Sequence, residues 1–361
     1  MKKRFFTIML VCVMALALAF SACGGGKGGD TAVAPPDKGE TEAAEPAATE
    51  PAPELVAEEG RFMGKDNTMS NDTITINSEW IPFQEAQKLT DWGPSMFAAT
   101  GDFVYVLSSV FIQDDGEAVP ESIVKEFKLT GGVLVYQGDM PIEGFTSITA
   151  DDNGVLYSSD FWGYLVGYKD GIELFSEKVA TSRTVMDPSG KTGFSWHSGN
   201  EAKVITMEGG IPEAAEDVQT YPEILNISSI NFGKNHVMVS GGSSNEEKNG
   251  HLVTVYDRNG NHEFIFGDAE FGEPGNIGFA KAVVETSNGF LVLDGNFHEI
   301  HTFEPDGSFI GSIKSEDLLG ANRAWFDSAR LMPDGSILIG MSQERADKSC
   351  YEYLIYRLTG F

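Results

Sequence analysis

The sequence predicts an all-β fold, a six-bladed β-propeller whose blades have four strands each. Residues 278–314 carry the clearest signal, four short segments of alternating small and apolar residues separated by turns rich in Gly, Asn, Asp and Pro. This pattern is typical of an antiparallel meander. A turn of this kind followed by an apolar segment recurs along the chain. The last blade is incomplete, and a strand-like segment at residues 72–80 could complete it and so close a ring.

Six copies of the turn and apolar segment are present, at a period of roughly 35 to 55 residues, which is the range of propeller blades. They are TGDFVYVLSS (100–109), DDNGVLYSSD (151–160), DPSGKTGFSW (187–196), GKNHVMVSGG (233–242), SNGFLVLDGN (287–296) and PDGSILIGMS (333–342). Because a single four-stranded meander cannot bury both of its faces alone, we expect the copies to pack radially around a channel.

The spacing of these copies gives the expected blades. Blades one to five cover residues 95–140, 145–179, 182–219, 227–268 and 279–315. Blade one carries an insertion at residues 111–120, and the fourth strand of blade three is poorly marked. Blade six offers an inner strand at 325–332 and further strands at 336–342 and 351–358. We expect residues 73–77 to supply its fourth strand, so that an N-terminal strand closes the ring and no blade edge is left unpaired.

Residues 272–313 resemble an NHL-type repeat, in which a glycine-led loop precedes an inner strand and an apolar second strand ends in Asp. Asp294 and Asp160 fill this strand-ending position. Trp196, Gly242 and Ser342 depart from it. The resemblance extends over residues 92–361 and implies a propeller fold, but no particular activity, since propellers host many functions.

The N-terminus has the pattern of an export signal. Three basic residues precede an apolar run at residues 5–20, which has the length of a signal-peptide core and is short for a membrane span. Small residues then precede Cys23, an arrangement that resembles a bacterial lipobox, with Phe20 where the family usually has an aliphatic residue. The resemblance implies that residues 1–22 are a lipoprotein signal peptide. It also implies that acylated Cys23 anchors the mature chain to a bacterial membrane outside the cytoplasm.

Residues 23–60 predict a disordered acidic tether. A segment rich in Gly, Ala, Pro, Glu and Thr without aromatic residues buries too little apolar surface to offset its ordering entropy. The propeller is then expected at residues 61–361, as a monomer, with Cys350 as a buried small hydrophobe. The chain has 54 acidic and 25 basic residues and a formal charge of −29. This acidity argues against nucleic acid and anionic membrane surfaces as partners.

Unusual residues gather at one end of the predicted ring, on the connections between strands two and three of a blade and on those between blades. Aromatic residues on loops, rimmed by polar groups, are typical of a recognition surface; the alternative is that they wedge between blades. The candidate ligand-binding residues are Trp162, Arg183, Trp196, His197, Lys281, Asn296, Phe297, His298, Arg323 and Trp325. The cationic Arg183, Lys281 and Arg323 favour an anionic ligand or a carboxylate.

This pattern predicts a lipid-anchored, non-catalytic binding or scaffold module for a peptide, a glycan or an envelope protein, with no catalytic residue and no cofactor. The alternative is a metal-dependent hydrolase or lyase similar to six-bladed lactonases. Its ligands or acid–base groups would be Asp327, Asn296 and His298, with His197. The sequence favours no metal site, because His298 and His301 lie three apart on an expected strand and point to opposite faces. The Asp-Gly turns are hairpins too short to supply the ligands of a calcium loop.

Overall fold

The computed structural model describes residues 64–361, with gaps at residues 65, 71–73, 86–88, 90–92, 115–116, 144, 161, 214–216, 246–249, 321–323 and 345–350. The described residues belong to the compact unit Thr49–Phe361. The predictions on the signal peptide, Cys23, the tether, Arg323 and Cys350 lie outside the described residues. Within the described part, no helix is long and apolar enough to cross a membrane.

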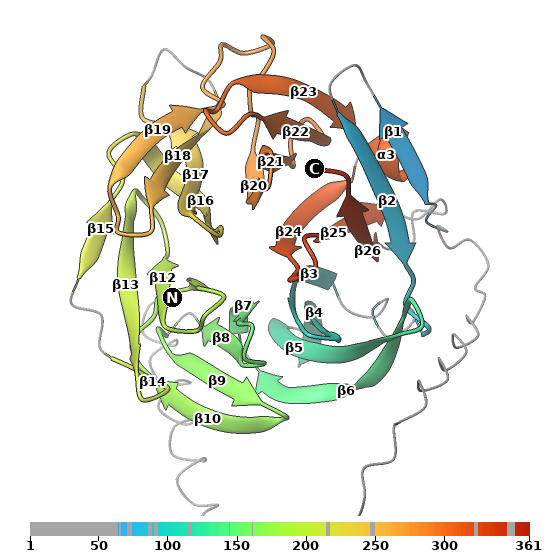
Figure 1. Ribbon diagram of the computed structural model, residues 1–361. Helices are drawn as coiled ribbons and strands as arrows, with labels where there is room; N and C mark the ends of the chain where they lie inside the picture. The colour runs from blue at the N-terminus through green and yellow to red at the C-terminus, as the bar shows by residue number, and fades with distance from the viewer. Residues whose placement is uncertain are drawn as a thin grey trace, which may run out of the picture. The chain divides into compact units, whose positions relative to one another are not determined.

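Six antiparallel sheets confirm the predicted all-β propeller with four-stranded blades, and Figure 1 shows them arranged in a ring. Blade one is β3 (Gly93–Thr100), β4 (Phe103–Asp114), β5 (Glu117–Thr130) and β6 (Val133–Glu143). Blade two is β7 (Phe145–Ala150), β8 (Leu156–Asp160), β9 (Leu165–Lys169) and β10 (Ile172–Glu177). Blade three is β11 (Arg183–Met186), β12 (Thr192–Trp196), β13 (Glu201–Glu208), β14 (Ile211–Pro212) and β15 (Val218–Thr220).

The second half of the ring follows the same plan. Blade four is β16 (Ile224–Phe232), β17 (His236–Ser243), β18 (His251–Asp257) and β19 (His262–Phe266). Blade five is β20 (Ala280–Thr286), β21 (Gly289–Asp294), β22 (Glu299–Phe303) and β23 (Phe309–Lys314). Blade six is β24 (Trp325–Leu331), β25 (Ile337–Glu344) and β26 (Tyr351–Thr359), completed by β2 (Thr75–Ile81) and β1 (Asn67–Ser70).

The N-terminal strand closes the ring, as predicted. β2 pairs antiparallel with β26, with Asn77 opposite Thr359 and Ile81 opposite Ile355, and β1 adds a fifth strand outside it. β2 ends at Ile81 rather than at the expected Asn77, because Ile81 still pairs with Ile355 and is buried in the cluster that blade six shares with blade one, on the face of β2 opposite to that of Ile76. Figure 1 shows both ends of the described chain meeting in this blade.

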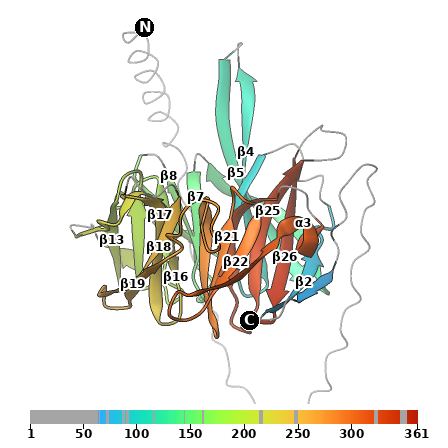
Figure 2. The same cartoon turned by 90° about the horizontal axis from the view of Figure 1, so that it is seen from above.

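The structure gives two expected features a definite form. The insertion at residues 111–120 is the continuation of β4 and β5, which pair as one long hairpin with Asp114 opposite Glu117. Figure 2 shows this hairpin projecting from the ring. The apolar residues that precede Asp114 and follow Glu117 in the sequence permit this pairing. In blade three, the fourth strand is divided into β14 and β15, which pair with opposite ends of β13.

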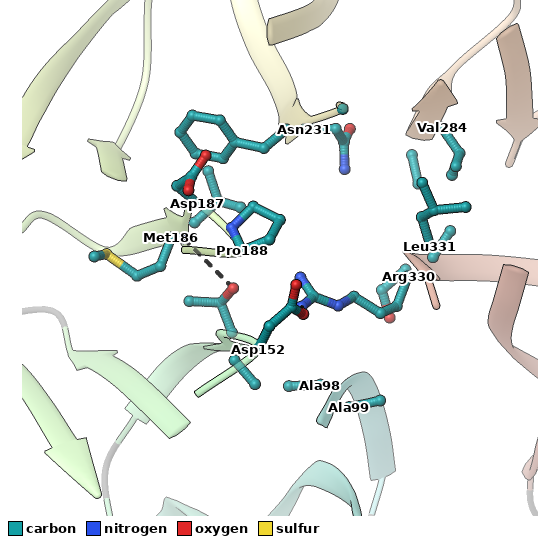
Figure 3. A pocket seen from close by; sticks show the side chains of 18 of the residues that line it. Ala98, Ala99, Asp152, Met186, Asp187, Pro188, Asn231, Val284, Arg330 and Leu331 are labelled. Carbon is teal, nitrogen blue, oxygen red and sulfur yellow. Dashed lines mark hydrogen bonds and ion pairs between the residues drawn. The ribbon is translucent and has the colours of Figure 1, made fainter. Parts of the chain in front are cut away.

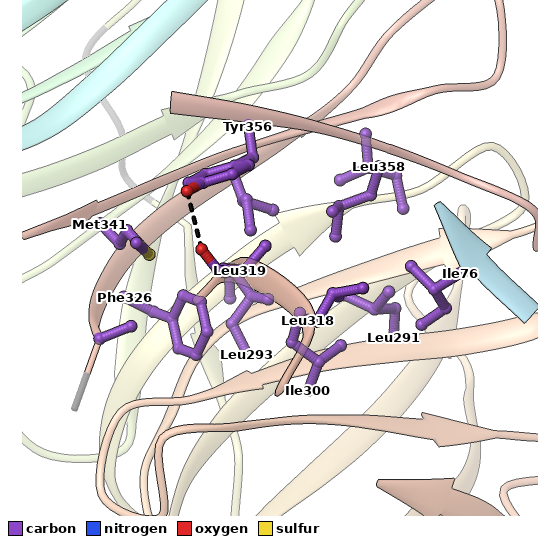
Figure 4. Close-up of a cluster of buried hydrophobic side chains, with 14 of the residues drawn as sticks. Ile76, Leu291, Leu293, Ile300, Leu318, Leu319, Phe326, Met341, Tyr356 and Leu358 are labelled. Carbon is purple, nitrogen blue, oxygen red and sulfur yellow. Dashed lines mark hydrogen bonds between the residues drawn. The ribbon is translucent and has the colours of Figure 1, made fainter. Parts of the chain in front are cut away.

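Apolar side chains fill the spaces between the blades. The cluster between blades five and six is drawn in Figure 4, and the short helix α3 (Ser315–Leu319) in the connection between these blades inserts Leu318 and Leu319 into it. The Tyr356 hydroxyl donates a hydrogen bond of 3.0 Å to the Leu319 carbonyl, which ties this connection to β26. Such packing holds neighbouring sheets rigidly, so that the ring can position the loops at its ends.

Polar side chains link the inner strands around the channel. An inner strand is an edge strand of its sheet, so the backbone groups on its channel side lack a partner within that sheet. The Ser328 hydroxyl of blade six accepts the Phe97 N–H of blade one at 3.1 Å, and the Ser147 hydroxyl of blade two accepts the Thr184 N–H of blade three at 3.0 Å. Asn231 of blade four accepts a backbone N–H of blade five in the same manner.

Candidate functional site

The two ends of the ring carry different connections. The loop face consists of the connections between strands two and three of each blade and the connections between blades. The turn face consists of the hairpin turns between strands one and two and between strands three and four. All of the predicted ligand-binding residues that are described belong to the connections of the loop face or to the adjoining strand ends.

Four side chains of blades four to six form an aromatic patch on the loop face. Phe271 lies 6.0 Å from Phe297, and His298 meets Trp325 edge to face at 5.2 Å, both measured between ring centroids. Phe271 is 70% exposed and Trp325 is 51% exposed. Because Phe297 and His298 are consecutive, the two ring pairs are joined through one loop. We call Phe271, Phe297, His298 and Trp325 the aromatic patch.

Asp294, at the end of β21, organises the loop that carries this patch. Its carboxylate accepts the N–H groups of Gly278 at 2.6 Å, Asn296 at 2.8 Å and Phe297 at 3.0 Å, and it lies 3.3 Å from the His301 imidazole. Burial alone would raise the pKa of Asp294, but these hydrogen bonds lower it below its ordinary value. The strand-ending Asp of the sequence pattern is therefore a fixed anion that shapes the loop.

His298 has a backbone conformation that few residues adopt. Its φ is 57°, in the left-handed region, which costs free energy in a residue with a side chain. Its Nδ1 lies 3.0 Å from the Ala324 carbonyl oxygen, in the connection that leads into β24. This contact fixes the ring against Trp325, so the loop of blade five and the start of blade six are positioned together.

The other predicted residues lie in a second group or in the core. Trp162 is 65% exposed on blade two, where Asp160 accepts its N–H at 2.9 Å. In blade three, the exposed His197 lies 2.7 Å from the Ser182 hydroxyl, and Arg183 donates weakly to the Ser228 carbonyl at 3.4 Å. The structure places Trp196 in the core of blades three and four, only 6% exposed, so it does not contribute to the face.

Lys281 and Asp327 lie near the beginnings of their inner strands, at the loop-face end of the channel. The Lys281 ammonium sits 4.8 Å from the centre of the Phe279 ring. Burial lowers the pKa of Lys281, while the charge of Asp327 opposes that shift. Burial raises the pKa of Asp327 to about 7. Hydrogen bonds from the hydroxyls of Ser328 and Tyr353 and the positive charge of Lys281 act in the opposite direction and lower this pKa. The two groups thus influence each other's protonation.

The residues of the hydrolase alternative make separate contacts. His298 binds the Ala324 carbonyl, Asp327 accepts the Ser328 hydroxyl at 2.7 Å, and the exposed Asn296 flanks Gly278. Among the described residues, no group of three or more His, Cys, Asp and Glu side chains could hold a metal ion.

The turn face carries a feature that sequence reasoning missed. A cavity of about 940 Å³ in the channel is lined by inner strands and by the first turns of several blades, and Figure 3 shows Arg330 reaching Asp152 across it. The sequence signals for this site are charged residues within expected inner strands, namely Lys281, Asp327 and Arg330.

Comparison with known proteins leaves the family open. No protein-family model and no curated protein matches the chain. Among solved structures, the WD40 β-propeller domain of Doa1 aligns with a TM-score of 0.42 at 12% identity, covering 75% of this chain and 97% of that domain. A subtype N11 neuraminidase-like protein of a flat-faced bat strain aligns with a TM-score of 0.46 at 9% identity, covering 75% of this chain and 88% of that one.

Proposed function

We propose that the protein is a cell-envelope β-propeller that acts as a non-catalytic binding or scaffold module, with its ligand on the loop face. The observation that carries this proposal is the aromatic patch. Two of its rings are more than half exposed, although burying an aromatic side chain is strongly favourable. Exposed aromatic side chains on a rigid frame are typical of recognition surfaces, since they offer large contact areas at a small entropic cost.

The loop that carries the patch is held in place by hydrogen bonds. Asp294 accepts two of its backbone N–H groups, those of Asn296 and Phe297, as well as that of Gly278 in the preceding connection, and the Ala324 carbonyl fixes His298. A surface ordered before binding loses less conformational entropy when the ligand arrives. The patch suits a peptide or a glycan, whose apolar faces can rest on the rings while polar edges meet the rim of His298 and Asn296.

Export and lipid anchoring complete the proposal. The basic and apolar N-terminus followed by small residues and Cys23 supports a lipoprotein tethered through residues 23–60. Labelling of the chain by an alkyne fatty acid in cells should disappear in the Cys23→Ser variant; labelling that persists would contradict the anchor.

Site-specific photocrosslinking tests the binding surface. A photoreactive amino acid placed at Trp325 or at Phe271 should yield the same crosslinked species in intact cells. The matched control is Leu174, which is 50% exposed on the outer strand β10 of blade two and remote from the patch. Adducts that are equal at Leu174, or adducts that differ between Trp325 and Phe271, would contradict a ligand on the aromatic patch.

A further inference from the structure

Turn residues of several blades line one end of the channel cavity, so this end lies at the turn face, opposite the loop face that carries the aromatic patch. Its wall consists of inner-strand residues, among them Val185, Ala329 and Leu331. Its rim consists of turn residues such as Pro188 and Lys234. A volume of about 940 Å³ is sufficient for a small molecule, since ligand sites commonly occupy about 300 to 1,000 Å³.

The charge of this cavity is opposite in sign to that of the chain. Five basic side chains line it, namely Lys191, Lys234, Arg258, Lys281 and Arg330, against three acidic ones, Asp152, Asp187 and Asp327. The whole chain has 25 basic and 54 acidic residues. The cavity is thus a cationic site within a strongly acidic protein, and a concave site of one charge concentrates ligands of the opposite charge.

Arg330 crosses the cavity to reach a blade that is not its neighbour. From β24 of blade six, its Nη2 donates to Asp152 Oδ1 in the β7–β8 turn of blade two at 2.5 Å. Blade one lies between them, and its inner strand presents Ala98 and Ala99, whose small side chains leave room for the arginine (Figure 3). The Arg330 side chain lines the cavity and is 17% exposed.

The carboxylate that Arg330 binds is a replaceable one. The Asp152 side chain is 52% exposed, and it belongs to a surface turn. By contrast, the Asp187 side chain, which pairs with Arg258, is 3% exposed and also accepts the Ser189 N–H at 2.7 Å. An arginine fork recognises any carboxylate with the same geometry, so a ligand could supply the group that Asp152 now supplies.

A second donor and apolar walls complete the site. Asn231 Oδ1 accepts the Val283 N–H and the Ser229 hydroxyl, each at 3.1 Å. These bonds orient the amide so that its nitrogen faces the cavity (Figure 3). Val185, Ala329 and Leu331 are only partly buried and offer an apolar surface beside Arg330.

We propose that the channel binds a small organic carboxylate with an apolar body, entering from the turn face. The ligand carboxylate takes the place of Asp152 on Arg330, and the body lies against Val185, Ala329 and Leu331. This site is separate from the aromatic patch and does not rest on the function proposed for the loop face.

Calorimetric titration of the purified full chain with octanoate tests this proposal. Octanoate should bind with a stoichiometry of one, and octan-1-ol, which has the same body without the charge, should bind at least about tenfold more weakly. Arg330→Gln should weaken octanoate binding by about tenfold or more. Asp152→Asn removes the competing carboxylate and should strengthen binding, by up to about fivefold.

Two variants serve as controls. Arg357→Gln breaks an ion pair with Glu79 between β26 and β2, away from the cavity, and should leave octanoate binding unchanged. Trp325→Ala should also leave it unchanged, which separates this site from the loop face. The proposal is overturned if octanoate does not bind, if octan-1-ol binds equally well, or if Asp152→Asn weakens binding as Arg330→Gln does, since Asp152 would then serve only to hold the fold.

Discussion

Because of Asp327, we expect the free energy of unfolding of the protein to fall as the pH rises. The group lies in the inner strand of blade six, where burial raises its pKa from the ordinary 3.8 to about 7. The folded state therefore binds this proton more tightly than the unfolded state does. Below about pH 4, Asp327 is protonated in both states and its burial costs no desolvation of charge. Between about pH 4 and pH 7 the unfolded state loses this proton first, so the free energy of unfolding falls, and above about pH 7 it falls no further.

The magnitude follows from the size of the shift. A shift of about 3 pKa units, at about 1.4 kcal/mol each, amounts to a loss of about 4 kcal/mol in the free energy of unfolding at pH 8. At pH 5 the loss is about 2 kcal/mol, because only part of the interval between the two pKa values has been crossed. Asp327→Asn keeps the shape of the protonated acid and removes the titration. We expect it to be more stable than the wild type by these amounts.

Urea unfolding of both proteins at pH 5 and pH 8 measures this difference. Asp334→Asn is the matched control in the same blade. The Ser336 hydroxyl and N–H bind the Asp334 carboxylate and lower its pKa, so this variant should lose stability at pH 8. A difference between Asp327→Asn and the wild type that is the same at both pH values, or an Asn variant that is the less stable at pH 8, would refute the reasoning.

Three further predictions concern the frame that holds the site. Asp294→Ala leaves the N–H groups of Gly278, Asn296 and Phe297 without their acceptor and should lower the free energy of unfolding by about 3 kcal/mol or more; a loss under about 1 kcal/mol in calorimetry would contradict its organising role. Leu319→Ala opens a cavity between blades five and six and should cost about 2 to 5 kcal/mol in urea unfolding, whereas an unchanged midpoint would show that the cluster collapses. Removing residues 64–81 leaves the outer edge of β26 unpaired and should cause self-association in size-exclusion chromatography; a monomer that unfolds in one cooperative step would show that β2 is dispensable.

The blades could be predicted because their signals are local. A hairpin needs Gly, Asn or Asp in its turn and alternation on its flanks, and both are visible within ten residues. β2 could be predicted because the last blade lacked a partner. The insertion at residues 111–120 could be located from the sequence but its conformation could not, because only the pairing of Asp114 with Glu117 shows that it extends β4 and β5.

The exposure of the candidate residues could not be predicted from local patterns. Trp196 and Trp325 both lie at loop-face strand ends, but Trp196 is buried by the core that it shares with Tyr221 and Ile224, whereas Trp325 stays exposed. The pair of Arg330 and Asp152 joins residues 178 positions apart on non-adjacent blades. Such contacts depend on the register of several strands at once, and a shift of one residue reverses each side chain.

The candidate sites lie where the blade pattern is broken. An inner strand is expected to present small or apolar side chains, and Arg330 places a charge there. An aromatic side chain is expected to be buried, and Trp325 stays in solvent. A residue with a side chain is expected to avoid positive φ, and His298 adopts it to meet Ala324. Each departure lowers the stability of the fold, and the packing of the surrounding blades offsets this loss. Such departures concentrate at functional positions. Asp294, by contrast, obeys the repeat pattern, which is why we assign it to the loop architecture and not to chemistry.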